Sequence, residues 1–308
     1  MADQVISMRE PSTANSHLPK SSQVHPQPKS FGWIRATHPE AIEFTQCLPG
    51  NRGLMFVFSV IGLFTLGPFG IWTATHGDSP MSWLDALFLV FPLISLLILI
   101  FAIRFELFRP SDEPIIFDRK NRKVHRISRD VHAGLKGLFM PWPMRSASYD
   151  WDLVEAQHVV NTVMTGNTTT RFHALVMVVK DQHDPTLCVD QFHVGNSFIM
   201  GEFMVGPLWE HIRRFMEEGG PHLPRGDELA NMQRPSTWWQ SMKAVFPRAE
   251  GHSFFEWLKE ELPFALLLLA LAPLTLPIYL IWGTGNWLSH KTTVPVQWPS
   301  EILATVRG

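Results

Sequence analysis

The chain has 308 residues, of which 45% are hydrophobic and 18% are charged, and its formal net charge at pH 7 is −2. This charged fraction is below the roughly 25% of an average soluble domain, and the near-neutral balance does not favour nucleic acid as a partner. Only two cysteines are present, which excludes a disulfide framework and favours a reducing compartment.

Residues 1–50 are predicted to form a cytoplasmic tail. Residues 1–30 are rich in Ser, Pro, Gln and His, and they lack the basic and then apolar start of a secretory signal. Such a composition cannot bury enough apolar surface to offset the entropy lost on ordering. We therefore expect residues 1–30 to be disordered, with a partly ordered stretch after them.

Two apolar runs within residues 51–105 predict a transmembrane helical hairpin. Each run is close to the ~20 residues that cross a bilayer as a helix. Arg35 and Arg52 precede the first run, Arg104 and Arg109 follow the second, and the short loop between the runs has no Lys or Arg. Because Lys and Arg are enriched on the cytoplasmic side, we expect both ends of the hairpin to be cytoplasmic and the protein to be a multi-pass protein of the inner membrane.

A third apolar run, residues 263–282, contains Pro273 and Pro277. Two alternatives stay open: one kinked span that places the tail 283–308 outside, which we favour, and a re-entrant hairpin that keeps the tail inside. The preceding segment, residues 231–262, is dense in Trp and Phe. This pattern is typical of an amphipathic segment lying along lipid headgroups, and packing against a soluble domain is the equal alternative.

The polar segment between the second and third runs, residues 106–230, predicts a cytoplasmic domain of antiparallel strands. Residues 114–117 and 124–127 form a predicted hairpin, and three more strand-like runs cover residues 148–160, 171–180 and 186–194. Residues 206–219 then show a helical period of apolar residues that a Gly-Gly-Pro sequence ends. The predicted fold class is therefore an α+β membrane protein with an antiparallel sheet closed by a C-terminal helix.

This order of strands followed by one helix resembles the pleckstrin-homology-like (PH-like) domains that bacteria attach to membrane hairpins. A second resemblance rests on the run WEHIRRFMEEGGPHLP at residues 209–224 and on the pairs Trp298-Pro299 and Glu301-Ile302. These residues are similar to an uncharacterised family of bacterial polytopic membrane proteins found beside type VI secretion effector genes. The resemblance implies a non-enzymatic role in effector immunity or as an accessory protein, with a secreted effector as partner. The alternative is a membrane-anchored lipid- or ligand-sensing module.

Two sets of basic residues are the candidate contact sites. The first lies in the predicted hairpin just after the second span, where anionic headgroups attract cations; it contains Arg119, Lys120, Arg122, Lys123 and Arg126. The second is Arg213 and Arg214 on the polar side of the predicted helix. For the first set the alternative is a hairpin whose cations are only solvated. For the second set the alternative is a helix that only caps the sheet through Trp209. In that case the two arginines are exposed and contribute little to stability.

We expect no catalytic residues, no metal site and no cofactor. The His and Cys residues show no HExxH or CxxC spacing, and no Gly-rich phosphate loop or G-x-S-x-G turn occurs. Cys188 lies in an apolar strand-like run, and we expect its thiol to be buried.

Overall fold

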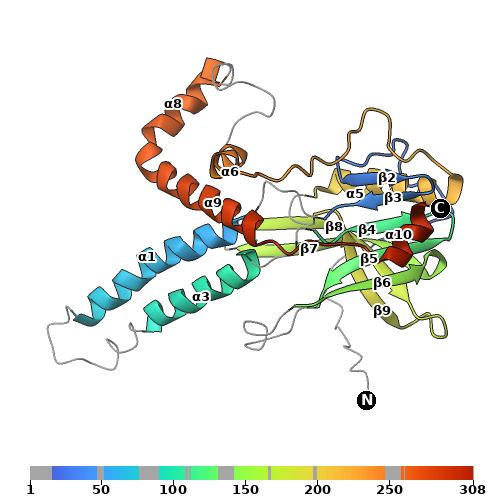
Figure 1. The fold of residues 1–308 in the computed structure, drawn as a ribbon, viewed down its shortest axis with the longest axis horizontal. Coiled ribbons are helices and arrows are strands. Elements are labelled where there is room, and N and C mark those ends of the chain that lie inside the picture. The colour runs from blue at the N-terminus through green and yellow to red at the C-terminus, as the bar shows by residue number, and fades with distance from the viewer. Residues whose placement is uncertain are drawn as a thin grey trace.

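Two antiparallel sheets and one long helix form one part of the molecule, and apolar helices extend from it (Figure 1). The computed structural model describes residues 16–46, 52–75, 90–107, 110, 112–130, 142–165, 168–196, 200–246, 258–259 and 261–307. The predicted α+β domain with antiparallel sheets is confirmed.

The first sheet has five strands in the order β2-β3-β4-β5-β6. Their bounds are β2 Ile34–His38, β3 Ala41–Phe44, β4 Ile115–Asp118, β5 Lys123–Arg129 and β6 Met144–Asp150. Because side chains alternate between the faces of a strand, one face carries the large apolar residues of the core: Ile42, Phe44, Ile115, Phe117 and Val124. The opposite face carries Ala41, Glu43, Ile116 and His125.

The second sheet has four strands in the order β1-β7-β8-β9. Their bounds are β1 Ser16–Leu18, β7 Val154–Thr165, β8 Thr168–Lys180 and β9 Cys188–Val194. The chain passes from β6 into β7 through a single turn of 3-10 helix, Trp151–Leu153. Trp151 is buried there, so the corner between the two sheets belongs to the core.

Helix α5 (Glu202–Glu218) closes the core. Its period places Leu208, Trp209, Ile212 and Phe215 on the face that packs against both sheets. The indole of Trp209 stacks on that of Trp151 with 5.9 Å between ring centroids. Gly219 ends the helix with a φ of +65°, the left-handed conformation that glycine adopts at low cost. The prediction of a helix that closes the sheet is therefore confirmed.

The prediction that residues 1–30 are disordered is wrong for residues 16–30. Strand β1 pairs with β7, and the segment after it crosses α5. Its backbone forms hydrogen bonds to the helix, since Pro19 O accepts from Trp209 Nε1 at 3.2 Å and Lys29 N donates to Pro207 O at 3.1 Å. Composition underestimated this order because main-chain contacts, rather than a high content of apolar side chains, hold the segment.

Residues 16–46, which the prediction assigned to an N-terminal tail, are therefore part of the sheet domain. Strands β2 and β3 lie within this range, and β3 pairs directly with β4. Residues 1–15 lie outside the described residues. The apolar helices that follow β3 are thus an insertion between two neighbouring strands of one sheet.

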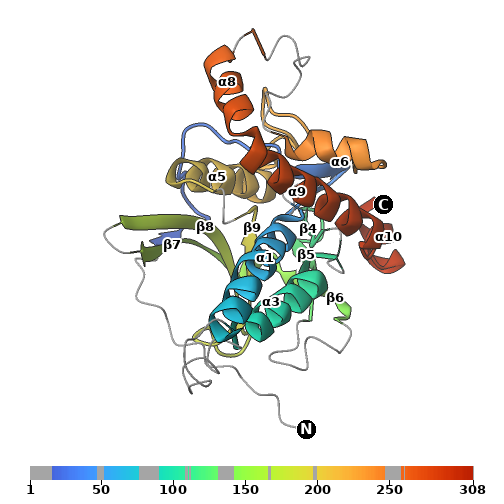
Figure 2. The same cartoon turned by 90° about the vertical axis from the view of Figure 1, so that its left-hand side faces the viewer.

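Helices α1 (Leu54–Thr75) and α3 (Val90–Leu107) lie side by side and point away from the sheets (Figures 1 and 2). Residues 54–73 of α1 are long and apolar enough to cross a membrane. Helices α8 (Leu262–Ala270) and α9 (Ala272–Thr292) meet at 87° and together could form one broken span. The described residues thus hold one or two candidate spans. Most of the predicted loop, residues 73–82, and the beginning of the second apolar run lie outside the described residues. The three-span layout stays a prediction.

The bases of α1, α3 and α9 meet in a buried polar junction. Glu106 Oε1 accepts a hydrogen bond from Gly53 N at 2.6 Å, and Arg52 O accepts one from Asn286 Nδ2 at 3.1 Å. Gly53 has a φ of +89°, and a Cβ there would lie 2.5 Å from Asn286 N. Only glycine suits this position, for conformational and for steric reasons.

The two ends of the α8–α9 segment return to the same side of the molecule. Helix α6 (Trp238–Val245) packs along α9, with Trp238 Nε1 donating to Thr284 Oγ1 at 3.1 Å. After α9 the chain forms a bridge between Val294 and Pro110, and α10 (Ser300–Arg307) packs on the five-stranded sheet. Helix α10 thus lies against the sheet domain, and the side of a membrane on which the tail lies stays a prediction.

Helix α6 packs against α9, and Trp239 is 70% exposed. The placement of residues 231–262 along lipid headgroups or against the sheet domain stays a prediction. The bend between α8 and α9 occurs at Leu271, and Pro273 stands in the first turn of α9, where its missing N–H costs no hydrogen bond.

We predict that Trp209→Ala lowers the free energy of unfolding by about 3–5 kcal/mol, the usual cost of removing a buried aromatic side chain. Trp209 is fully buried, whereas Phe203 on the same helix is 76% exposed and provides the matched control, Phe203→Ala. Denaturant unfolding followed by Trp fluorescence measures both. A Trp209→Ala protein as stable as the control would contradict the packing of α5.

Candidate functional site

Glu210, Arg213 and Arg214 form a buried ion cluster on the outer side of α5. Glu210 is fully buried, and its carboxylate accepts hydrogen bonds from Arg213 Nη2 at 2.8 Å and Arg214 Nε at 2.6 Å. The amide of Val24 donates to Glu210 Oε2 at 2.9 Å. Arg213 is only 3% exposed and also pairs with Glu218 at 2.7 Å.

The cluster binds the N-terminal segment, residues 19–29, to the helix. Arg213 Nη1 donates to Lys20 O at 3.4 Å, and Arg214 Nη2 donates to His25 O at 3.5 Å. The prediction that both arginines lie on a polar, solvent-facing side is therefore wrong for Arg213. Helical periodicity placed it outside, but a segment 190 residues away in the sequence covers that side. The described contacts of both arginines are internal.

The electrostatics of Glu210 follow from these contacts. Burial alone would raise the pKa of Glu210, but hydrogen bonds from Arg213, the Val24 amide and Arg214 outweigh it and lower the pKa to about 2. The folded protein therefore favours the ionised carboxylate more strongly than the unfolded chain does.

The basic hairpin is also largely neutralised by neighbouring carboxylates. Arg119 pairs with Glu40, Arg122 with Asp152 and Arg126 with Asp190, each at 2.6 Å between nitrogen and oxygen. Lys120 and Lys123 are exposed. Arg119, Arg122 and Arg126 of this predicted site are thus engaged within the domain itself.

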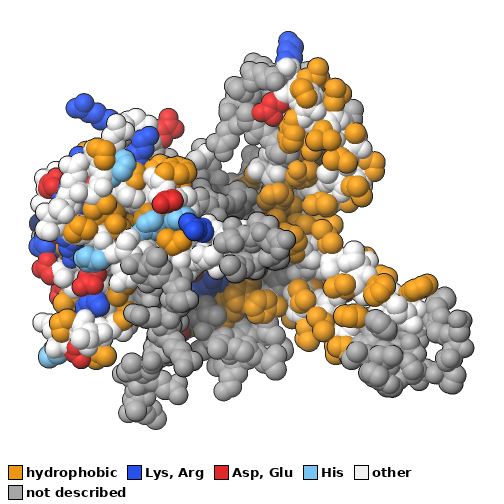
Figure 3. Space-filling view, turned by 180° about the vertical axis from the view of Figure 1, so that it is seen from behind, with side chains coloured by type: hydrophobic (Ala, Val, Ile, Leu, Met, Phe, Trp, Pro, Cys, Tyr) orange, Lys and Arg blue, Asp and Glu red, His pale blue; other side chains and the backbone are white. Residues whose placement is uncertain are grey.

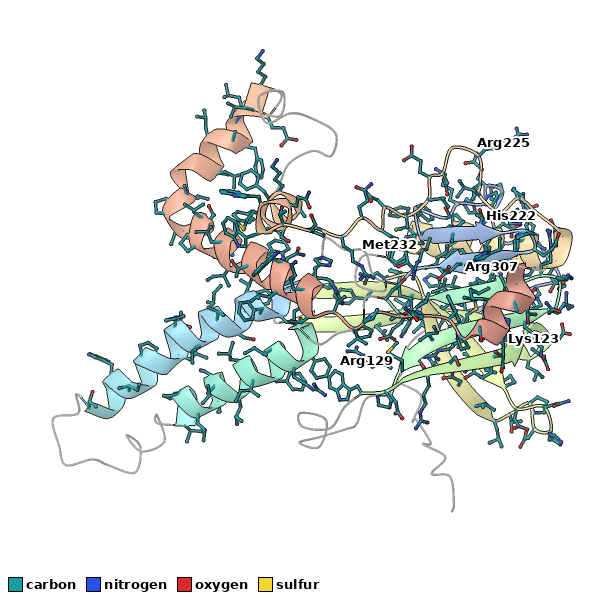
Figure 4. All side chains as sticks on the ribbon, viewed as in Figure 1. Lys123, Arg129, His222, Arg225, Met232 and Arg307 are labelled. Carbon is teal, nitrogen blue, oxygen red and sulfur yellow. The ribbon has the colours of Figure 1, made fainter. Side chains whose placement is uncertain are left out.

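The hairpin lies far from the apolar helices. Figure 4 shows Lys123 at the end of the sheet domain that is remote from α1 and α3, whereas Arg129, at the other end of β5, lies on the side of α3. The sequence places the hairpin soon after an apolar run, but β4 carries the chain away from it. This placement argues against headgroup contact through Arg119, Lys120, Arg122 and Lys123.

The remote end carries a charged cluster that the sequence did not reveal. Glu217 on α5 accepts from Trp151 Nε1 at 2.5 Å and lies 3.4 Å from Arg122. Lys20 donates to Trp151 O and lies over the indole, and burial lowers its pKa to about 8. A hollow of about 340 Å³ adjoins the cluster, lined by Asn121, Arg122, Asp150, Asp152, Leu153 and Gln182. Lys20 and Glu217 were missed because they come from distant parts of the chain.

The structure also places the cysteine and histidine candidates. Cys188 is exposed, so the predicted buried thiol is wrong: β9 is an edge strand, and its side chains near Cys188 face outward. His158 and His173 share a hydrogen bond of 2.9 Å. Within the described part of the chain no three His, Cys, Asp or Glu side chains are grouped as metal ligands.

We predict that Arg213→Ala destabilises the fold by about 3–5 kcal/mol, since removing one partner strands a buried charge. The exposed Lys123→Ala is the control and should change stability by less than about 0.5 kcal/mol. Denaturant unfolding measures both variants, and equal stability of the two would contradict a buried cluster.

The pH dependence of stability gives a second test of the cluster. Because the pKa of Glu210 is lowered to about 2, its contribution is present above its ordinary value of 4.5 and is lost as pH falls toward 2. Glu210→Gln should therefore flatten the fall in stability between pH 4.5 and pH 2. An unchanged pH profile would mean that Glu210 is not the group that titrates.

The sequence profile of a family of unknown function, DUF6708, matches residues 92–307. No curated protein and no solved structure matches the chain. The matched region contains most of α3, β4 to β9, α5 and all helices after it. The expected membership of an uncharacterised family is confirmed, while its link to secretion effectors stays a prediction. The chain belongs to the DUF6708 family of unknown function.

Proposed function

We propose that this protein is a membrane-anchored, non-enzymatic binding protein of the bacterial inner membrane, associated with type VI secretion as an effector immunity or accessory protein. The observation that carries the anchoring is the segregation of its surface. Apolar side chains gather over the helices, and charged and histidine side chains gather over the sheet domain (Figure 3). A large exposed apolar surface marks a membrane or protein contact, and here it continues along α1, α3, α8 and α9.

The architecture of the sheet domain supports a binding role. In this proposal the two antiparallel sheets and their closing helix serve as the expected PH-like module, a scaffold that presents its surface to partners. The remote charged end projects away from the apolar helices (Figure 1). In this proposal a secreted effector is bound on the cytoplasmic side, where the bilayer does not obstruct it.

A specific observation favours lipid contact as a second candidate function. At the base of α3 the guanidinium groups of Arg104 and Arg129 lie 5.2 Å and 5.0 Å from the ring of Trp142. Phe105 lies 4.5 Å from the same ring. Arginine with aromatic residues at the base of an apolar helix is typical of the headgroup region. Anionic lipids would therefore be sensed here rather than at the β4–β5 turn.

Topology reporters test the anchoring. Since α10 packs on the sheet domain, we expect fusions at Asn196 and after Gly308 to report the same, cytoplasmic compartment. A fusion at Asp78, in the predicted loop between the apolar runs, should report the periplasm. Opposite signals from Asn196 and Gly308 would contradict the one-sided arrangement, and a cytoplasmic signal from Asp78 would contradict the hairpin.

Co-expression tests the immunity role. The effector encoded beside this protein should stop growth when expressed alone, and co-expression of this protein should restore growth. A variant with Trp209→Ala should protect less because its domain is destabilised, and Phe203→Ala should protect like the unchanged protein. Growth arrest that persists despite normal amounts of this protein in the membrane would refute immunity and leave an accessory or lipid-sensing role.

A further inference from the structure

A hollow of about 500 Å³ lies where three distant parts of the chain meet beside the five-stranded sheet. Its lining comes from strands β2 and β3, from the segment at residues 230–232 and from residues 297–307. Met232 and Arg307, both in this lining, are labelled in Figure 4. The volume falls within the range of pockets that bind small molecules, about 300–1,000 Å³.

The C-terminal wall of the hollow is fixed to the sheet at two points. Trp298 lies in the extended segment before α10, and its Nε1 donates a hydrogen bond of 2.9 Å to Glu43 Oε1. Near the end of α10, Val306 is 4% exposed and packs on the sheet. Because both ends of this wall are held, the hollow has its shape before any ligand binds, as most small-molecule sites do.

The lining carries more positive than negative charge. Its Arg, Lys, Asp and Glu side chains are Arg35, Arg307 and Glu43. Glu43 is buried, and its carboxylate already accepts from Trp298 and lies 3.6 Å from Arg35 Nη1. Arg307 is exposed and has no ion-pair partner among the residues that the structure describes. A guanidinium with unused donors suits a carboxylate, to which it can donate a pair of parallel hydrogen bonds.

A second polar group of the lining also lacks a partner. Within the described part of the chain His38 Nε2 is buried and makes no hydrogen bond, and Glu43 Oε2 lies 3.8 Å away, beyond hydrogen-bond distance. Buried polar atoms without a partner are uncommon in native proteins, and each calls for an explanation. Since His38 belongs to the lining, an oxygen of a bound ligand could supply the partner.

The remaining lining is mainly apolar. It consists of Ala36, Ala230, Met232, Leu303 and the indole of Trp298, together with the amide side chain of Gln297. Apolar walls around a few polar groups are the usual composition of a small-molecule site, because the walls take the ligand out of water and the polar groups fix its orientation. The lining therefore fits a ligand with an apolar body and one negatively charged end.

We propose that this hollow binds a small organic carboxylate, whose charged end pairs with Arg307 and whose apolar body lies against Met232, Leu303 and Trp298. Helix α10 supplies both the cation and part of the apolar wall, so the site needs α10 in its docked position and no element has to move. This site is separate from the proposed role in binding an effector. A hollow filled only by water would show no preference between a carboxylate and an uncharged analogue.

Fluorine NMR measures binding of para-fluorophenylacetate to the full-length protein in nanodiscs of zwitterionic lipid, with nanodiscs that lack the protein as background. We expect the protein to broaden and shift the fluorine signal of the probe at millimolar concentration. The alcohol para-fluorophenylethanol has the same ring without the charge. It should bind about ten-fold more weakly, since a hydrogen bond to a charged group is worth roughly that factor.

Three variants locate the probe. Arg307→Gln removes the cation and should weaken binding of para-fluorophenylacetate about ten-fold. Arg225→Gln is the matched control, because Arg225 is exposed, lies outside the lining and is labelled in Figure 4; this variant should bind like the unchanged protein. Leu303→Trp fills the hollow and should abolish binding. Leu303 is outside the apolar cluster that holds α10, and circular dichroism checks that all three variants are folded.

Each of four results would overturn the carboxylate site. The first is a fluorine signal at millimolar probe that does not differ from the nanodisc background. The second is equal affinity for the acid and the alcohol, the third is equal affinity of the Arg307→Gln and Arg225→Gln proteins, and the fourth is binding that survives in Leu303→Trp. Since none of these readouts involves an effector or cell growth, the site can fail while co-expression still protects cells, and protection can fail while the probe still binds.

Discussion

The buried junction of Arg52, Gly53, Glu106 and Asn286 determines how the rest of the molecule is arranged. The start of α1, the end of α3 and the last turns of α9 share its hydrogen bonds, including Ser289 Oγ to Glu106 O at 2.8 Å. Buried polar groups that lose their partners cost more than most single contacts gain. The three helices therefore stay together at their bases, and every apolar helix leaves the sheet domain from the same end.

This arrangement makes the sheet domain discontinuous in sequence. Its parts come from residues 16–46, from the region between β4 and α5, and from α10, and apolar helices interrupt it twice. Strands β3 and β4 pair although α1 and α3 lie between them in the chain. A shift of the paired helices would therefore act directly on the centre of the five-stranded sheet. The same sheet carries the face on which α10 packs.

Local patterns in the sequence predicted the elements with strong periodicity. The β4–β5 hairpin follows from two apolar stretches around Asp118 to Asn121, and α5 with its buried Trp209 follows from a 3.6-residue period. Strand β6, with the sequence MRSASYD, lacks the apolar alternation of a strand and was recognisable only through its pairing with β5. The burial of Arg213 and the exposure of Cys188 depend on which distant segment covers each position. Long-range coverage of this kind leaves no periodic signal in one sequence.

The same distinction bears on the basic hairpin as a candidate contact site. Arginines at 2.6 Å from carboxylates of their own domain have little electrostatic attraction left for a partner, and exposed ion pairs are worth at most about 1 kcal/mol. Specific recognition instead uses a few buried anchors surrounded by weaker contacts. A ligand at the hairpin would first have to break these existing ion pairs.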